Sequence, residues 1–313
     1  MDAPLIAIMG PTASGKTALA MAICDHLPAD VISVDSALVY RGMDIGTAKP
    51  NERELARVPH RLIDIVDPSD VYSAGQFRRD ALTHIEAIRA DERTPVLAGG
   101  TMLYFRALLN GIDALPDADP AVRASLDAKA AEIGWPAMHK TLAQIDAVAA
   151  ARIHANDAQR IQRALEVHQI AGKTLTELQR NAAPGLSLPV IKLGLLPTDR
   201  ATLHARIEAR FDQMLEAGLV EEVRALLARF DLRPDHPALR AVGYRQIAAY
   251  LRDETTLAQA RLDAITATRR LARRQLTWLR KEEDLIVVES DAADAVKRGL
   301  SALIERGVPL QGL

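Results

Sequence analysis

The segment from Gly10 to Thr17 is the part of this chain whose residue types and spacing most clearly indicate a chemical function. It reads GPTASGKT and directly follows the apolar run Leu5 to Met9. This is the P-loop pattern, in which backbone N–H groups and the positive end of the following helix surround phosphate oxygens. Lys16 adds a full positive charge, and the Thr17 hydroxyl suits Mg²⁺. We therefore predict a polyphosphate site, of the kind that binds nucleotides such as ATP, formed by Gly10, Pro11, Thr12, Ala13, Ser14, Gly15, Lys16 and Thr17.

Asp35 is a second candidate for a chemical role, because it directly follows the β-branched run Val31 to Val34. Ligands of open parallel sheets bind beyond the carboxyl ends of the strands. We therefore expect Asp35 to face the P-loop across one site.

The strand predicted at Pro95 to Ala98 is not followed by an acidic residue. It ends in Gly99-Gly100-Thr101, where hydrolytic P-loop proteins usually place a metal-binding Asp. Asp64 and Asp67 are alternatives, but we interpret them as turn residues. Asp35 is therefore the carboxylate best placed to act in the predicted site.

Strands and helices alternate around these residues, which predicts an α/β fold with a P-loop-type parallel sheet flanked by helices. Between residues 116 and 188 the chain is alanine-rich without a convincing strand, and Asp119 and Pro120 resemble a helix cap and first turn. We predict a core of residues 1–115 and 189–313 and an all-helical insertion domain at 116–188. Further expected elements are strands at 61–65 and 190–196 and helices from Ser73 to Ala90 and from Asp199.

Composition restricts the class of protein further. A length of 313 residues with 49% apolar content is typical of a packed protein of about two domains. A net charge of −2 gives no global sign of a nucleic-acid partner. The single Cys24 excludes an internal disulfide, the first strand begins too early for a signal peptide, and no apolar run could span a membrane. We expect a soluble cytoplasmic protein.

A local basic surface is predicted in the last third of the chain. One predicted helix carries six basic residues with no acid before Glu282, and their spacing forms a stripe able to follow a phosphate backbone. On its own, such a run is more often a solvated helix face. The six residues are Arg269, Arg270, Arg273, Arg274, Arg280 and Lys281.

Several segments taken in order resemble the bacterial tRNA dimethylallyltransferases, also called tRNA isopentenyltransferases. They are GPTASGKT, Val34-Asp35-Ser36, MDIGTAKP (Met43 to Pro50), AGGT (Ala98 to Thr101), VGYRQ (Val242 to Gln246) and RRLARRQLTWLRK (Arg269 to Lys281). The resemblance implies transfer of a dimethylallyl group from dimethylallyl diphosphate to N6 of the adenosine immediately 3′ of the anticodon, in tRNAs reading codons that begin with U. It also implies Mg²⁺ as cofactor, the tRNA anticodon stem-loop as partner and a monomeric enzyme without a membrane partner.

Site residues follow from this resemblance by matching position. It implies that Asp35 is the general base on the adenine amine, with Thr101 beside it and Lys16 on the diphosphate. Arg206 and Arg210 are weaker candidates for the diphosphate. The implied tRNA contacts are Asp35, Ser36, Ala37, Leu38, Thr101, Arg123, Gln159, Arg160, Ile161, Gln162, Arg163, Arg240, Ala241, Val242, Gly243, Tyr244, Arg245, Arg273 and Arg274.

Two other functions remain open at this point. A small-metabolite kinase would use the P-loop for ATP and Asp35 for a hydroxyl acceptor. A non-catalytic RNA-binding module could retain an inactive P-loop, although the intact Lys16, Thr17 and Asp35 argue against it. We interpret Cys24, His60 and Trp278 as structural residues.

Overall fold

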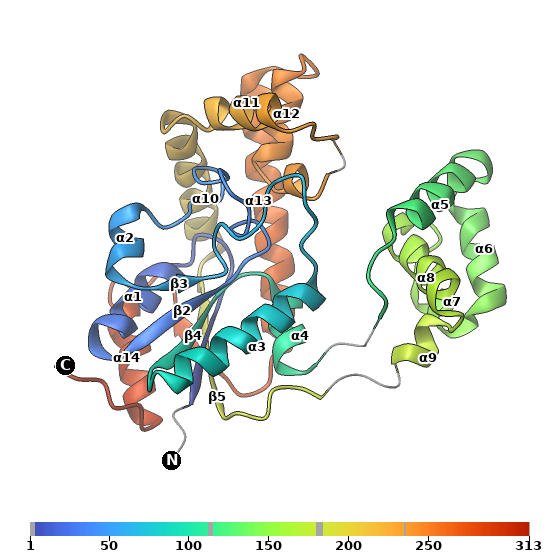
Figure 1. Cartoon of the computed structure of the whole chain (residues 1–313). Coiled ribbons are helices and arrows are strands. Elements are labelled where there is room, and N and C mark those ends of the chain that lie inside the picture. The colour runs from blue at the N-terminus through green and yellow to red at the C-terminus, as the bar shows by residue number, and fades with distance from the viewer. Residues whose placement is uncertain (1–3, 112–114, 180–183, 235, 313) are drawn as a thin grey trace. The chain divides into compact units, whose positions relative to one another are not determined.

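A computed structural model describes residues 4–111, 115–179, 184–234 and 236–312. The chain divides into two compact units, one formed by Met1–Leu108 and Ser187–Leu313 and the other by Leu109–Leu186. The first unit contains the sheet, and the described residues of the second contain helices without strands (Figure 1). Each unit is described separately.

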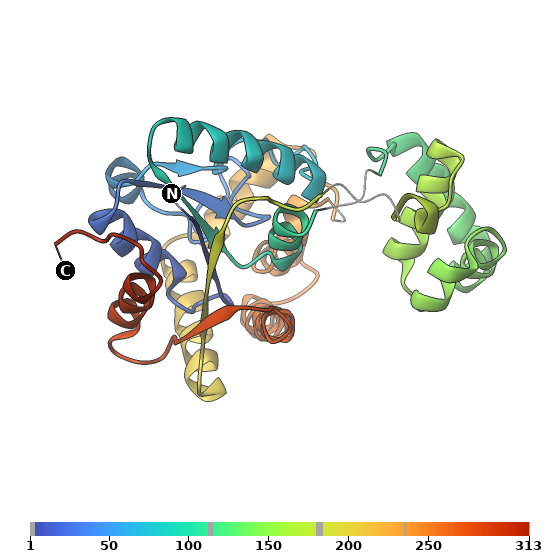
Figure 2. The ribbon, with the colours of Figure 1, turned by 90° about the horizontal axis from the view of Figure 1, so that it is seen from below.

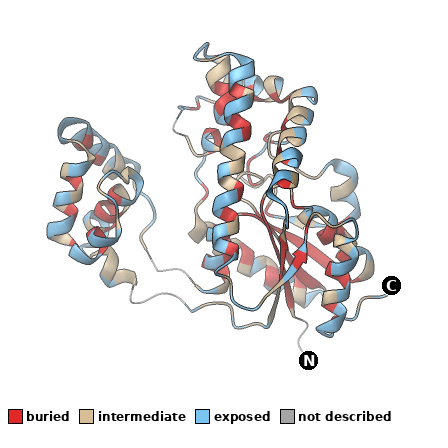
Figure 3. Ribbon diagram, turned by 180° about the vertical axis from the view of Figure 1, so that it is seen from behind, coloured by how far each residue is buried: buried red, intermediate tan, exposed pale blue. Residues whose placement is uncertain are grey.

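The α/β unit is built on one parallel sheet whose described residues form six strands in the order β3-β2-β4-β1-β5-β6. Every residue of the first two strands is buried, as expected for parallel strands covered on both faces (Figure 3). The predicted fold class is confirmed. The strands are β1 (Leu5–Met9), β2 (Ala29–Val34), β3 (His60–Arg61), β4 (Thr94–Gly99), β5 (Val190–Leu196) and β6 (Leu285–Glu289).

Helices cover both faces of this sheet because the chain crosses it in both directions. The step from β1 to β2 runs opposite to the step from β3 to β4, and right-handed crossovers then place their helices on opposite faces. Figure 2 shows this arrangement, with α3 (Ala74–Ala90) on one side and α1 (Lys16–His26) on the other. The last helix, α14 (Ala295–Glu305), packs beside α1, where Leu19 and Leu300 share a core.

Helix starts agree with the sequence analysis where a capping residue marks them. Ser73 caps α3 in a capping box with Gln76, and Asp199 accepts two backbone hydrogen bonds at the start of α10 (Arg200–Glu216). The remaining helices of this unit are α2 (Glu52–Arg57), α4 (Met102–Leu109), α11 (Leu219–Arg229), the 3₁₀ turn η1 (Ala238–Arg240), α12 (Tyr244–Leu251) and α13 (Leu257–Leu279). Within the described residues, no helix has both the length and the apolar character needed to cross a membrane.

Two strands at the sheet edges differ from the prediction. The strand expected at 61–65 ends at Arg61, since Leu62 and Asp64 adopt positive φ angles of 62° and 55° that take the backbone out of the extended region. The edge strand β6 was not predicted. Its exposed Val287 and Glu289 alternate with better-covered neighbours, and a charged segment precedes it.

The described residues of the helical unit form five helices around a small core that includes Leu126, Met138, Leu142, Ile161 and Leu165. Asp119 accepts hydrogen bonds from two backbone N–H groups at the start of the first helix, as predicted. The helices are α5 (Pro120–Ile133), α6 (Trp135–Ile145), α7 (Ala147–Arg152), α8 (Ala158–Ala171) and α9 (Leu175–Gln179).

Candidate active site

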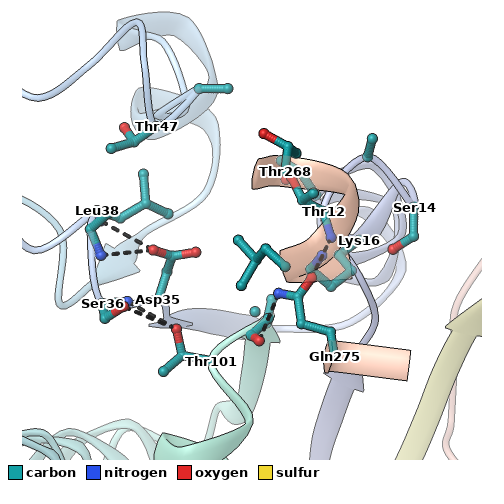
Figure 4. Close-up of a pocket in the computed structure, with 18 of the residues that line it drawn as sticks. Thr12, Ser14, Lys16, Asp35, Ser36, Leu38, Thr47, Thr101, Thr268 and Gln275 are labelled. Atoms are coloured by element: carbon teal, nitrogen blue, oxygen red, sulfur yellow. Dashed lines mark hydrogen bonds between the residues drawn. The ribbon is translucent and has the colours of Figure 1, made fainter. Parts of the chain in front are cut away.

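A cavity of about 1130 Å³ lies at the carboxyl ends of the sheet strands. Its wall combines the P-loop, the ends of β2 and β4, the loop around Thr47, and side chains of α10 and α13. In the close-up of Figure 4, Asp35 and Thr101 lie on one side and Lys16, Thr12 and Gln275 on the other. The structure thus brings the predicted phosphate site and the predicted carboxylate to one cavity.

The P-loop turns tightly between β1 and α1. A Cβ at Gly10 would lie 2.6 Å from Ser14 Oγ and 2.9 Å from the Leu195 carbonyl oxygen, so a larger residue cannot replace this glycine without a backbone shift. Ser14 Oγ is buried without a hydrogen-bond partner among the described residues. An unsatisfied buried hydroxyl in a glycine-containing loop at a helix N-terminus suits an anionic ligand.

Lys16 Nζ donates to the Pro11 carbonyl at 2.6 Å and lines the cavity. Burial lowers the pKa of Lys16 to about 8, although the nearby carboxylate of Asp35 opposes this shift. Arg210 on α10 also lowers it by like-charge repulsion. The ammonium therefore has much of its hydration removed before any ligand arrives.

Arg210 is the second cation of the cavity. Burial lowers its pKa and Asp35 opposes the shift, which places the guanidinium near that carboxylate. Within the described chain its one hydrogen bond is a long one, 3.4 Å from Nη2 to the Thr47 carbonyl oxygen, so most of its donors remain available. Arg206 instead donates to the Ser290 carbonyl at 2.8 Å and does not line the cavity, so its predicted contact with the diphosphate is wrong.

Asp35 is held by the turn that follows β2. Its Oδ1 accepts from the backbone N–H groups of Ala37 at 2.8 Å and Leu38 at 3.4 Å. Thr101 Oγ1 accepts from the Ser36 backbone N–H at 3.1 Å, which joins the end of β4 to this turn. Among the described residues no donor contacts Asp35 Oδ2, so one carboxylate oxygen is available to a substrate.

Gln275 on α13 connects two edges of the cavity, and sequence reasoning missed it. Its Oε1 accepts from the Thr12 backbone N–H at 3.1 Å, and its Nε2 donates to the Gly100 carbonyl at 2.8 Å (Figure 4). The side chain is 8% exposed. Gln275 therefore fixes the P-loop relative to the end of β4. The available signal was its register with the inward-facing Ala272 and Leu279.

Glu222 on α11 is another positioning residue that the sequence did not reveal. Its carboxylate accepts from the consecutive backbone N–H groups of residues 44, 45 and 46, at 2.7–3.1 Å, and from the Tyr244 hydroxyl at 2.5 Å. A Cβ at Gly46 would meet the Tyr244 ring at 2.5 Å, which explains the glycine in this loop. Glu222 thereby holds the loop that brings Thr47 to the cavity.

The predicted tRNA contacts of the α/β unit fall into two groups. Ser36, Arg240, Arg245, Arg273 and Arg274 are exposed, whereas Ala37, Leu38, Thr101, Ala241 and Val242 are half-buried. Tyr244 is fully buried with its hydroxyl on Glu222, and Gly243 is buried beside it. A side-chain contact between Tyr244 and tRNA is therefore excluded in this conformation, because the ring belongs to the core.

The helical unit corrects further predicted contacts. Ile161 is 0% exposed and packs in the helical core, so its side chain cannot reach RNA. Arg123 and Arg163 form ion pairs with the fully buried Glu166 at 2.8 and 2.6 Å, which gives both a structural role, while their contact with tRNA stays a prediction. Gln159 and Arg160 remain exposed, and Gln162 is half-buried.

The basic helix α13 is only partly a free surface. Arg269 pairs with Glu208 of α10 at 3.1 Å. Arg270, Arg273, Arg274 and Arg280 are exposed, and within the described residues none of them forms an ion pair. On a solvated, salt-bridged helix face the arginines would have acidic partners. Several arginines without such partners on one helix therefore suit contact with a polyanion.

The family model described as IPP transferase matches residues 38–282. The chain belongs to this family. Two solved bacterial structures are similar along almost the whole chain. One is a tRNA isopentenylpyrophosphate transferase from Bacillus halodurans, with 36% identity, a TM-score of 0.70, and coverage of 97% of this chain and 95% of that one. The other, from Staphylococcus epidermidis, has 29% identity, a TM-score of 0.68, and coverage of 97% and 100%.

A eukaryotic dimethylallyltransferase acting on tRNA shares the fold, with a TM-score of 0.81 at 24% identity over 98% of this chain and 81% of that one. The family match begins after the P-loop and Asp35, so the assignment of these two features depends on the geometry described above. Membership of the IPP transferase family confirms the resemblance seen in the sequence. It does not favour the kinase or the inactive RNA-binding module.

Proposed function

We propose that this IPP transferase family member transfers a dimethylallyl group from dimethylallyl diphosphate to N6 of an adenosine in tRNA. The adenosine lies immediately 3′ of the anticodon, in tRNAs that read codons beginning with U. Family membership and the two bacterial tRNA transferases support the reaction class and the tRNA substrate. The single observation that carries the mechanism is the placement of Asp35 opposite Lys16 in one cavity, which Arg210 also lines.

The diphosphate leaving group is assigned to the P-loop side of the cavity. Backbone amides of the loop, Lys16 and Arg210 would stabilise the negative charge that develops as the allylic C–O bond breaks. Because these residues already line the cavity, they need little movement to reach the leaving group. The unpartnered Ser14 Oγ adds another donor beside them.

The P-loop also fits Mg²⁺. The Thr17 side chain is exposed and lines the cavity, and a hydroxyl together with diphosphate oxygens and water provides the oxygen ligands that Mg²⁺ prefers. When bound, the ion would supply further neutralisation of the leaving diphosphate.

The acceptor is assigned to the Asp35 side. An exocyclic adenine amine is a weak nucleophile, because its lone pair is delocalised into the ring. As N6 bonds to the allylic carbon, the amine must lose a proton, and the free Oδ2 of Asp35 can accept it. Thr101, which is bonded to the same turn, would orient the base.

Access to this cavity requires the adenosine to leave the stack of the anticodon loop, at a cost of a few kcal/mol. Phosphate contacts from the exposed arginines of α13 would offset that cost. Gln159 and Arg160 are the exposed candidates for RNA contact in the helical unit. We also propose that the enzyme works as a monomer in the cytoplasm.

The decisive experiment is a transfer assay in nucleotide-free buffer with unmodified tRNA, dimethylallyl diphosphate and Mg²⁺. We expect one dimethylallyl unit on one anticodon-loop adenosine, detected by mass spectrometry. ATP should act only as a weak competitor through its phosphates. Strict dependence on ATP, with ADP formed in step with product, would reject the transferase and favour a kinase.

A further inference from the structure

An exposed aromatic ring lies at the edge of the cavity, beyond the residues assigned above. Trp278 on α13 is 40% exposed, and Leu103 on α4 is 53% exposed; both line the cavity. The Arg106 guanidinium lies 5.9 Å from the centre of the indole ring. We call Leu103, Arg106, Arg274 and Trp278 the Trp278 rim.

This arrangement does not fit the structural role that the sequence suggested for Trp278. An aromatic side chain that stabilises a core is mostly buried, as Tyr244 and Phe105 are in this unit. Trp278 instead leaves a large part of its surface to solvent, and Leu103, another exposed apolar side chain, lines the same cavity. Exposed apolar surface next to a cavity typically marks a binding site.

The charges around the ring indicate what binds there. Arg106 and Arg274 are exposed, and in the part of the chain that the structure describes neither has an acidic partner. An apolar ring that contacts the Arg106 guanidinium and lies about one helical turn after Arg274 suits a flat, polarisable group attached to an anion. A nucleotide has both parts, since a base stacks on an aromatic ring or a guanidinium plane and its phosphate pairs with arginine.

The position of the Trp278 rim indicates which nucleotide of the substrate could bind there. Leu103 follows Thr101 by two residues at the start of α4. Trp278 follows Gln275 by less than one turn of α13, and Gln275 Nε2 donates to the carbonyl of Gly100, the residue before Thr101. The rim therefore adjoins the wall assigned to the reacting adenine. Extruding one base leaves each neighbour in the loop without a stacking partner on one side.

We propose that Trp278 stacks on an unpaired base of the RNA substrate next to the extruded adenosine, while Arg106 and Arg274 contact its backbone. The proposal rests on the proposed function and adds a specificity residue to it. The short allyl tail of the donor is the competing occupant, but it offers no anion at its apolar end for the two arginines.

Fluorescence gives a direct test because the chain has only two tryptophans, Trp135 and Trp278. In the Trp135→Phe variant, Trp278 is the only indole. Titration with an anticodon stem-loop RNA, without donor, should quench its emission saturably, with a midpoint equal to the dissociation constant from an independent binding assay. Dimethylallyl diphosphate alone should leave the emission unchanged. Quenching by the donor and not by RNA would overturn the proposal.

Kinetics give a second test. Stacking on an aromatic side chain corresponds to about a 5- to 150-fold effect, so Trp278→Ala should raise KM for the RNA by this factor. The KM for dimethylallyl diphosphate should stay within twofold, and Trp278→Phe should restore most of the loss. Unchanged KM for the RNA in a folded Trp278→Ala protein, checked by thermal unfolding, would reject the role.

An abasic scan of the loop identifies the base. Removing one base next to the target should weaken binding to the original protein as much as Trp278→Ala does, and the two changes together should give little further loss. If every abasic position and Trp278→Ala act independently, no base stacks on the ring. Failure of the proposed function would look different, because the unaltered enzyme would then not prenylate the RNA.

Discussion

The lowered pKa of Lys16 makes donor binding sensitive to pH. In the free protein, burial lowers this pKa to about 8. A bound diphosphate favours the charged ammonium, so the pKa must be higher in the complex. The sign follows from linkage: affinity is full below about pH 8 and falls as the pH rises through that value, until the pKa of the complex is reached.

The magnitude can be worked out from this pKa. At pH 9, about one tenth of Lys16 is charged in the free protein, so the dissociation constant of the donor should be about ten times its value at pH 7. The donor itself does not obscure this change, since a phosphate ester is almost fully ionised above about pH 7. Cys24 does not interfere either, because burial raises its pKa to about 12.

The assay is isothermal titration calorimetry of dimethylallyl diphosphate between pH 7 and pH 9.5 at constant Mg²⁺ and without RNA. Binding near pH 9 should also take up protons, which buffers of different ionisation enthalpy reveal. The matched control is Lys16→Arg, whose guanidinium stays charged throughout. A similar fall in affinity in that variant, or a flat profile in the unaltered protein, would refute the assignment of the titration to Lys16.

Three other predictions test separate parts of the molecule. Asp35→Asn should lower the single-turnover rate by about 10²-fold or more while donor binding persists, and a near-normal rate would exclude Asp35 as the base. Arg273→Glu with Arg274→Glu should lower the log–log salt slope of tRNA binding by about 0.7–0.9 for each lost phosphate contact, and an unchanged slope would return α13 to a solvated face. Glu166→Gln should destabilise the helical unit by about 1–3 kcal/mol in urea unfolding, without changing donor affinity in the other unit.

Features with a local physical cause could be predicted from the sequence. The P-loop is one continuous segment whose glycines, lysine and threonine act through their own backbone and side chains. Ser73, Asp119 and Asp199 cap helices through bonds that span two or three residues. Asp35 needed only the rule that parallel strands end at the same edge of the sheet.

Features that depend on distant partners could not be predicted. Gln275 bonds to Thr12 across 263 residues of chain, and nothing near Gln275 in the sequence indicates this partner. Arg123 and Arg163, which the resemblance implies as RNA contacts, both pair with the buried Glu166, and nothing in the sequence indicates this shared partner. Residue type shows which bonds a side chain can form, but only the fold shows whether an internal partner already occupies it.

The helix α13 connects recognition to chemistry through adjacent residues. Arg273 and Arg274 face solvent, while the next residue, Gln275, is buried and bonded to both the P-loop and the end of β4. The donor side and the acceptor side of the cavity are thus tied to one element. That element also carries Arg273 and Arg274, so the residues proposed to bind RNA adjoin the residue that holds the P-loop to the end of β4.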